Sequence, residues 1–266
     1  MWIQDVRTDE DWKRIYTVPL CRTSDKTLPL PLLHERYKRL LRKKGLEKSD
    51  VIITPAELLK PKIKKIYKIE NAELVPNPVP IPYEENIKKQ EVPLAIFLGR
   101  LDPIKRPWIY AEIARKLPNV QFLFLGNSHF PEIMNPIMER YKEIKNLKFL
   151  GLTLGREKAE ILSKAWVLVN TSIHEALPMS FQEALSYKMA ILSCHNPDTI
   201  TSDYGSYTGQ PLGYGDHEIP RFVEELQYLL SNSIWKEKGE KGYEFIRRFA
   251  DAKKIEKRLD QILRSL

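Results

Sequence analysis

Residues 94–107 read Leu-Ala-Ile-Phe-Leu-Gly-Arg-Leu-Asp-Pro-Ile-Lys-Arg-Pro, and this stretch decides the fold class. Its first five residues are all apolar, which is typical of a strand buried on both faces of a sheet. A glycine, a charged loop and a proline follow, and proline is favoured in the first turn of a helix. The stretch therefore predicts a strand, a loop and the start of a helix.

The same alternation of strand and helix continues as far as residue 193. Further strands are expected at residues 120–125, 147–150, 167–170 and 190–193. Amphipathic helices are expected at residues 106–117, 131–142, 156–164 and 180–187. This pattern predicts an α/β fold, a Rossmann-like doubly wound parallel sheet. In such sheets the ligand binds at the carboxyl ends of the strands.

A proline-rich segment, Val-Pro-Asn-Pro-Val-Pro-Ile-Pro at residues 75–82, precedes this domain. Each proline fixes φ and removes a donor, so we expect a stiff extended linker. The elements expected before it are a strand at residues 2–6, a basic helix ending near Lys44, a strand at 51–54 and a helix at 56–67. Beyond residue 218 the apolar spacing is helical. We divide the chain at these points into residues 1–83, 84–248 and 249–266.

Composition places the chain among globular proteins. It has 266 residues, of which 42% are hydrophobic and 29% charged. No apolar run approaches the ~20 residues that span a bilayer, and the start of the chain does not read as a signal peptide. Two distant cysteines, Cys21 and Cys194, predict neither a disulfide framework nor a zinc site. A cytoplasmic location is expected.

The formal net charge of +8 favours anionic partners. One basic block comprises Arg36, Lys38, Arg39, Arg42, Lys43, Lys44 and Lys48, and another holds five lysines within residues 60–68. Each block can be a solvated helix face. Together they also permit a peripheral contact with the inner face of a membrane. Nucleic-acid binding is not expected, because neither a recognised motif nor an aromatic platform accompanies the basic residues.

Two loops carry candidate site residues. In the first, Gly99 ends a buried strand and lets the backbone approach a ligand, while Arg100 and Lys105 can hold a diphosphate. An ordinary surface loop with two cations is the alternative. In the second loop, Glu175 follows a strand, and Pro178 starts a helix whose free N–H groups favour an anion.

Glu183 lies a little over one turn into that helix and can face the same cleft as Glu175. A carboxylate accepts two hydrogen bonds from a vicinal diol, so the pair suits recognition of hydroxyl groups. A pair at this separation is common by chance. The arrangement of strand, loop and proline-started helix around it is what makes the pair informative.

Taken together, Gly99-Arg100 with Lys105 and His174-Glu175 with Glu183 resemble glycosyltransferase family 4, whose members are retaining enzymes with the GT-B fold. Glu175 and Glu183 match the E-x7-E motif of that family, and residues 97–107 match its strand and phosphate loop. Residues 75–79 resemble its interdomain segment. The resemblance runs from about residue 49 to the C-terminus, and several motifs occur in the right order.

The resemblance implies a nucleotide-diphosphate sugar as donor, a glycan or lipid-linked acceptor, and no cofactor or metal. Arg100 and Lys105 would neutralise the donor diphosphate, and Glu183 would bind the ribose. Glu175 would contact the transferred sugar. The implied backbone and lining positions are Gly126, Asn127, Leu150, Gly151, Leu152, Leu177, Pro178, Met179 and Ser180. His174 would orient Glu175 or touch the sugar, or else it is a packed loop histidine.

The sequence departs from that family in its N-terminal region. Residues 1–83 resemble only the tail of an acceptor-binding domain, and the usual glycine-rich opening loop has no counterpart. Ala176 stands where many relatives carry glycine. Residues 252–266 would expose part of an apolar face if that domain were missing. The expected activity is that of a hexosyltransferase. A non-catalytic nucleotide-sugar-binding subunit, completed by a partner chain, is the second interpretation.

Overall fold

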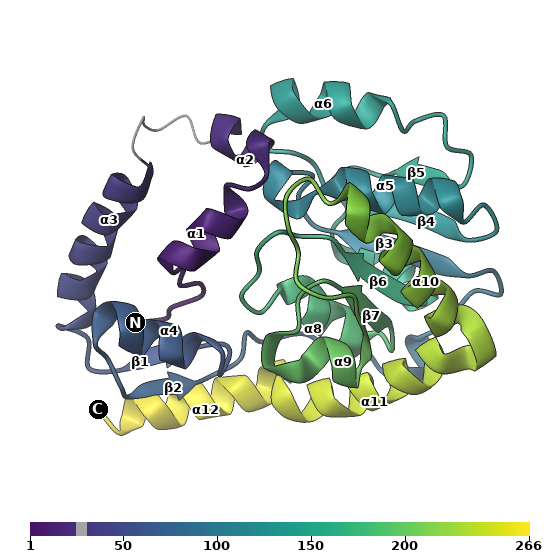
Figure 1. The fold of residues 1–266 in the computed structure, drawn as a ribbon. Coiled ribbons are helices and arrows are strands. Elements are labelled where there is room, and N and C mark those ends of the chain that lie inside the picture. The colour runs from purple at the N-terminus through teal and green to yellow at the C-terminus, as the bar shows by residue number, and fades with distance from the viewer. Residues whose placement is uncertain (25–30) are drawn as a thin grey trace.

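A computed structural model of the protein describes residues 1–24 and 31–266, with side chains for residues 1–21 and 37–266. Figure 1 shows a large sheet flanked by helices, and beside it a smaller unit that holds both chain termini. The strands are β1 (Ile52–Thr54), β2 (Ala72–Leu74), β3 (Leu94–Leu98), β4 (Gln121–Leu125), β5 (Leu147–Phe149), β6 (Val167–Asn170), β7 (Ala190–Ser193) and β8 (Gly205–Tyr207).

The large sheet has the strand order β5-β4-β3-β6-β7-β8, and every neighbouring pair is parallel. The chain moves outward from β3 to β5, then returns to β6 and moves outward to β8. The direction of winding thus reverses between β3 and β6, where open α/β sheets bind their ligands. Because the strands are parallel, the loops that follow all six gather at one edge.

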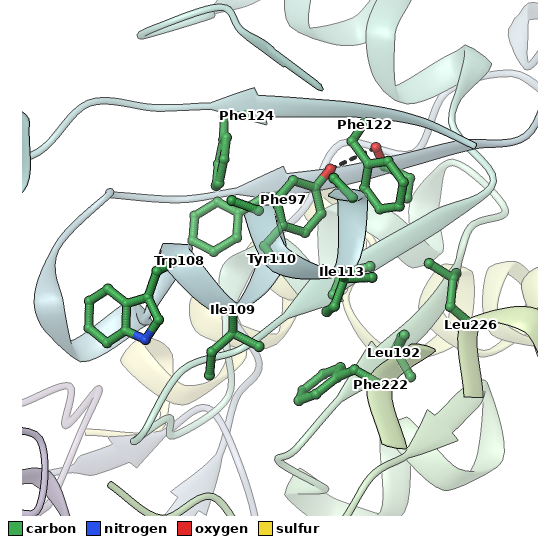
Figure 2. Packing of buried hydrophobic residues seen from close by; sticks show 14 of the residues in the cluster. Phe97, Trp108, Ile109, Tyr110, Ile113, Phe122, Phe124, Leu192, Phe222 and Leu226 are labelled. Carbon is green, nitrogen blue, oxygen red and sulfur yellow. Dashed lines mark hydrogen bonds between the residues drawn. The ribbon is translucent and has the colours of Figure 1, made fainter. Parts of the chain in front are cut away.

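One face of the sheet is covered by α5 (Pro107–Lys116), α6 (Pro131–Glu139) and α10 (Ile219–Leu230). Figure 2 shows the aromatic centre of this layer, in which Phe97, Phe122 and Phe124 surround Tyr110. The buried Tyr110 hydroxyl donates to the Ala95 carbonyl at 2.9 Å, so its polar atom is satisfied. The helix α5 is thereby fixed against the strand that leads into the first candidate loop.

The opposite face is covered by α7 (Gly155–Lys164), α8 (Met179–Ser186) and α11 (Ile234–Phe249). Phe181 of α8 packs in one cluster with Ile96 and Leu168 of the central strands. Successive strand residues therefore point into two different apolar layers, as the continuous apolar runs predicted. The short helix α9 (Ile200–Asp203) connects β7 with β8.

The smaller unit is built from the parallel pair β1-β2 with α3 (Pro31–Leu46) and α4 (Leu59–Tyr67). Two further helices, α1 (Asp9–Ile15) and α2 (Pro19–Ser24), run from it toward the large sheet. Ile15 and Val18 lie in the same apolar cluster as Trp108 of α5. The last helix, α12 (Ala252–Arg264), returns along β2 (Figure 1).

The structure differs from the sequence predictions in several elements. The strand expected at residues 2–6 is reduced to a single bridge between Trp2 and Ile53. The sequence did not predict the strands β2 and β8 or the helices α1 and α2. In α12, Ile255 and Ile262 are each 5% exposed and pack with Val75, whereas Leu263 is 67% exposed, so part of the apolar face is open as expected. Among the described residues, no helix is both long and apolar enough to cross a bilayer.

Candidate functional site

A cleft of about 550 Å³ opens at the carboxyl edge of the large sheet, over the ends of β3, β4, β5 and β6. We call it the edge cleft. It brings together eleven residues that the sequence singled out: Gly99, Arg100, Lys105, Gly126, Asn127, Leu152, Glu175, Pro178, Met179, Ser180 and Glu183. Their roles in binding stay predictions. Their convergence follows from the parallel strand order, which delivers every strand-end loop to the same edge.

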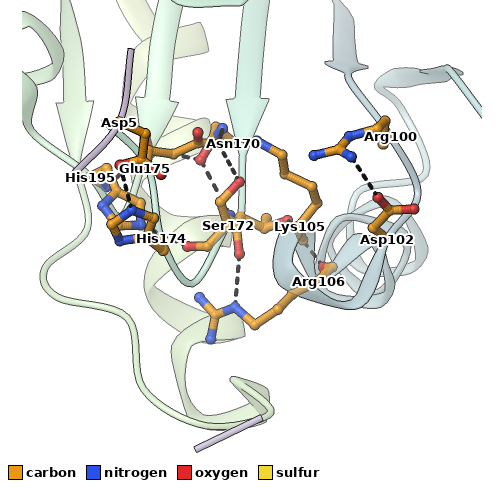
Figure 3. Close-up of polar contacts among 12 residues, drawn as sticks. Asp5, Arg100, Asp102, Lys105, Arg106, Asn170, Ser172, His174, Glu175 and His195 are labelled. Atoms are coloured by element: carbon orange, nitrogen blue, oxygen red, sulfur yellow. Dashed lines mark hydrogen bonds and ion pairs between the residues drawn. The ribbon is translucent and has the colours of Figure 1, made fainter. Parts of the chain in front are cut away.

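The centre of the cleft is an ion pair between Lys105 and Glu175. Lys105 Nζ lies 2.6 Å from Glu175 Oε1, and the same oxygen accepts from Asn170 Nδ2 at 2.9 Å and Ser172 Oγ at 2.6 Å (Figure 3). Burial alone would raise the pKa of Glu175. The charge and hydrogen bond of Lys105, with the Ser172 hydroxyl, instead lower it to about 2. The carboxylate is therefore ionised at neutral pH.

The backbone fixes the position of Lys105 from both sides. Lys105 is the last residue of a short 3₁₀ turn, and its amide donates to the Asp102 carbonyl at 2.9 Å. Its own carbonyl accepts the Thr171 hydroxyl at 2.8 Å. The Ile173 amide donates to the Ile104 carbonyl at 2.8 Å. The loop after β3 is thus cross-linked to the loop after β6, and the two charges of the ion pair are held in register.

Arg100 stands at the opposite wall of the cleft and is 51% exposed. Its guanidinium lies 3.3 Å from Asp102 and donates to His129 Nδ1 at 2.9 Å. Asp102 is almost fully buried and also accepts from the His129 amide at 2.8 Å and the Ser128 hydroxyl at 3.1 Å. One buried carboxylate therefore ties the loop after β3 to the loop after β4, and it orients Arg100 without removing it from solvent.

Gly126 allows these two loops to touch. Its φ is +139°, and a Cβ at this position would lie 2.0 Å from the Gly99 carbonyl oxygen. No side chain fits there, so the glycine is required by the close approach of the two strand ends. The Gly126 amide donates to the Gly151 carbonyl at 2.7 Å, which joins the loop after β5 to the same floor.

The helix α8 points its first turn into the cleft. Pro178 is its N-cap, with φ −65° and ψ 133°, and no side chain caps the N–H groups that follow. Met179 and Ser180 both line the cleft. Uncapped amides and the positive end of the helix dipole favour an anion at this place. Glu183, on the next turn, pairs with Lys158 Nζ at 2.6 Å.

Four predicted residues lie outside the edge cleft. Leu177 is buried in the apolar layer under α8. Gly151 lines a neighbouring cavity of about 550 Å³ that shares Gly126 and Asn127 with the cleft, and Leu150 borders neither of these two cavities. His174 turns away, with Nε2 3.2 Å from Asp5 Oδ1 and Nδ1 3.8 Å from Asp11. It is 5% exposed, as expected for a packed loop histidine.

The sequence reasoning also missed cleft residues, chiefly His129, Thr153, Leu154 and Lys158. His129 comes two residues after Asn127, so a longer window after the second strand would have included it. Lys158 carries no such signal, because it belongs to the interior of α7 and reaches the cleft only through the packing of α7 beside α8. In the part of the chain that the structure describes, no cluster of three His, Cys, Asp or Glu side chains is arranged to hold a metal ion.

The sheet order and the charged cleft at its carboxyl edge define a Rossmann-like α/β domain. Within it, residues 83–210 match the family described as glycosyl transferases, group 1. This segment contains every residue that lines the edge cleft. No curated protein matches the chain in sequence.

Solved structures share the fold at low sequence identity. Sucrose-phosphate synthase from Thermosynechococcus elongatus superposes with a TM-score of 0.70 and 16% identity, over 86% of this chain and 61% of that one. HepE from Anabaena, in complex with UDP and glucose, gives 0.71 and 11%, over 87% and 67%. The pneumococcal O-GlcNAc transferase GtfA, in complex with UDP and GlcNAc, gives 0.69 and 14%, over 85% and 47%.

Proposed function

We propose that the edge cleft binds a nucleoside-diphosphate sugar, and that this chain is the donor-binding part of a retaining, metal-independent glycosyltransferase of family 4. The observation that carries the proposal is the placement of two cations, Arg100 and Lys105, and two carboxylates, Glu175 and Glu183, around one cleft beside the uncapped start of α8. The match to group 1 glycosyl transferases supports it.

In this proposal the diphosphate lies between Arg100 and the first turn of α8, with Lys105 beneath it. The charge that develops on the leaving diphosphate meets cations that are already in place, so little reorganisation is needed when the bond to the sugar breaks. Glu175 uses Oε2 for a sugar hydroxyl, because its other three hydrogen bonds all end on Oε1. Glu183 accepts from the ribose diol. No protein nucleophile is assigned.

Calorimetric titration with UDP, GDP and ADP, without divalent metal, tests the donor site. One diphosphate should bind, and Arg100→Ala and Lys105→Ala should each weaken it at least about tenfold, as expected for loss of a charge-assisted contact. Lys148→Ala is the matched control, since Lys148 is exposed on β5 and does not line the edge cleft. In Arg100→Ala the buried Asp102 loses this ion pair but keeps the hydrogen bonds from the His129 amide and the Ser128 hydroxyl, and circular dichroism checks that the variant is folded. Unchanged affinity in this folded variant would refute the phosphate assignment.

A non-catalytic nucleotide-sugar-binding chain is the second candidate. The chain spans 61% of the synthase and 47% of GtfA, and GtfA is also known in a GtfA/B complex. A partner chain that carries an acceptor domain would complete such a subunit. Sugar transfer catalysed by the isolated 266-residue chain would exclude a purely binding role.

We also propose a cytoplasmic location with peripheral contact to an anionic membrane surface through α3 and α4. Tyr37, Leu40 and Leu41 of α3 are 60%, 63% and 52% exposed beside Arg42 and Lys43. Apolar side chains flanked by cations suit the headgroup region of a bilayer. Co-sedimentation with vesicles that contain phosphatidylserine, but not with neutral ones, is the expected result, and equal sedimentation with both would count against it.

A further inference from the structure

A second pocket continues the carboxyl edge of the sheet beyond the edge cleft. The edge cleft covers the ends of β3 to β6, whereas the second pocket lies over the ends of β6, β7 and β8. It has a volume of about 240 Å³. Glu175 lines both cavities, so they meet at the carboxylate that faces the proposed sugar position. A ligand in the second pocket would therefore be the neighbour of the transferred sugar.

Among the residues that the structure describes, one positive charge that lines the second pocket has no carboxylate partner. Lys62 of α4 reaches into it, but its ammonium pairs with Asp11 at 2.8 Å. Glu175 is neutralised by Lys105. Arg14 of α1 also lines the pocket, and among the described residues no carboxylate comes within ion-pair distance of its guanidinium. The charge balance of the pocket thus favours an anionic group next to Arg14.

The remaining polar groups suit hydroxyls. His195 Nε2 donates to the Ser172 carbonyl at 2.9 Å, so in the neutral ring Nδ1 is an acceptor. Burial lowers the pKa of His195 to about 4, which keeps the ring neutral at pH 7. Tyr207, the last residue of β8, adds a hydroxyl, and Gln210 in the loop that follows adds an amide. The pocket thus offers a neutral hydrogen-bond acceptor on His195, the polar groups of Tyr207 and Gln210, and the cation of Arg14. This set fits a polyol with a single anionic substituent.

We propose that the second pocket binds the acceptor, and that the acceptor is a single sugar unit that carries a phosphate or a carboxylate. This rests on the proposed donor site. The anionic group lies on Arg14 with Lys62 nearby, and the reacting hydroxyl points toward Glu175 and the donor sugar. The volume is below the ~300–1,000 Å³ of common small-molecule pockets, which suits one ring in place of a longer chain.

The transfer step balances with these two ligands alone. The acceptor oxygen forms a bond to the anomeric carbon of the donor while the bond from that carbon to the diphosphate oxygen breaks. The nucleoside diphosphate leaves with the electron pair, stabilised by Arg100 and Lys105. The proton of the acceptor hydroxyl passes to the departing diphosphate oxygen. Both bonds lie on one face of the sugar, so the anomeric configuration is retained.

Calorimetry on the 266-residue chain, with the tightest-binding nucleoside diphosphate present, tests this. The probes are glucose 6-phosphate, glucuronic acid, glucose and inorganic phosphate. At least one anionic sugar should bind tenfold or more tightly than glucose, and Arg14→Gln should abolish that preference while nucleotide affinity stays unchanged. The stronger of the two anionic sugars identifies the substituent. Arg115→Gln, at an exposed arginine of α5, is the control.

The outcomes separate the two proposals. If the unmodified chain binds none of the nucleoside diphosphates, the proposed donor site is overturned, and with it the acceptor role of the second pocket. With nucleotide bound normally, equal affinity for glucose and both anionic sugars would overturn the anionic acceptor. Anionic-sugar binding that survives Arg14→Gln would overturn the second pocket as its location. Inorganic phosphate binding as tightly as glucose 6-phosphate would show a phosphate site without sugar recognition, and this too would overturn the proposal.

Discussion

Glu175 accepts hydrogen bonds from Lys105, Asn170 and Ser172 through the same oxygen, Oε1. None of the residues that the structure describes donates to Oε2. An ionised carboxylate has about four acceptor positions, and the ones on Oε2 are therefore open to a ligand. Glu183 differs, because its partner Lys158 is on a flexible stem and both side chains are about a quarter exposed. The two carboxylates therefore differ in what they offer a ligand, a free oxygen on Glu175 and a carboxylate paired with a movable lysine on Glu183.

This difference predicts opposite selectivities for two variants. Glu183→Gln should weaken the nucleoside diphosphate by roughly 5- to 100-fold, the effect of removing one charged hydrogen-bond acceptor. Glu175→Gln should leave the diphosphate within about threefold and weaken the intact sugar donor instead. Calorimetry with both ligands measures the split. The reverse pattern would mean that the two roles are exchanged.

At the scale of residues, sequence reasoning found the charges that come directly after strands and missed those that reach the cleft from helices. Arg100, Lys105 and Glu175 were predictable, because the end of a parallel strand fixes where the next residues lie. Lys158 was not, since its approach depends on how α7 packs. For His174 the sequence left two alternatives open, a role beside Glu175 and a packed loop histidine, because adjacency in sequence does not decide which way a side chain turns; the side chain lies against Asp5 and Asp11.

The start of α5 is held by Arg106, which has φ +45° and a fully buried side chain. Its guanidinium forms a bidentate pair with Glu218 at 2.7 and 2.8 Å and donates to the Thr171 carbonyl at 2.8 Å. Three strand-end loops therefore meet at one side chain, directly behind Lys105. The ion pair keeps the loop after β3 in place without itself facing the edge cleft.

The helix α10 offers a comparison between this buried pair and a surface pair. Glu218→Gln should lower the free energy of unfolding by about 3–5 kcal/mol, because the buried guanidinium loses its counter-charge. Glu224→Gln, which breaks an exposed pair with Arg221 on α10, should cost less than about 1 kcal/mol. Urea unfolding measures both. Equal effects would show that Arg106 is not the structural anchor we describe.

At the scale of elements, prediction succeeded where the apolar run was long and failed where pairing creates the element. The strands β6 and β7 begin and end where the sequence predicted. The strand β8 has no apolar run, and it exists because Gly205 approaches β7 so closely that a Cβ would lie 1.7 Å from the Ile191 carbonyl oxygen. Residues 2–6 show the opposite case. Their apolar pattern is that of a strand, but a strand needs a hydrogen-bonded neighbour along its length, and these residues have only the bridge from Trp2 to Ile53.

The whole molecule is joined by apolar contacts between segments distant in sequence. Ile15 and Val18 of the N-terminal region pack with α5, while Ile255 and Ile262 of α12 pack against Val75 and the small sheet. A two-stranded sheet is marginally stable alone. The first 83 residues therefore depend on the large domain and on α12, and we expect the chain to unfold in one cooperative step.

Helix α12 provides the test of that cooperativity. Ile255→Ala should destabilise the chain by about 2–4 kcal/mol, the range for removing a buried aliphatic side chain, because Ile255 is 5% exposed. Leu263→Ala on the same helix, where the leucine is 67% exposed, should change stability by less than about 0.5 kcal/mol. Thermal unfolding measures the loss, and hydrogen exchange locates it. If the small unit and the large sheet unfold together, the backbone amides of β1 and β2 and those of the large sheet should lose protection from hydrogen exchange to the same extent in Ile255→Ala. Loss confined to β1–β2, with the large sheet still protected, would instead mean that the two units unfold independently, and that Arg14 and Lys62 are only loosely held beside the edge cleft.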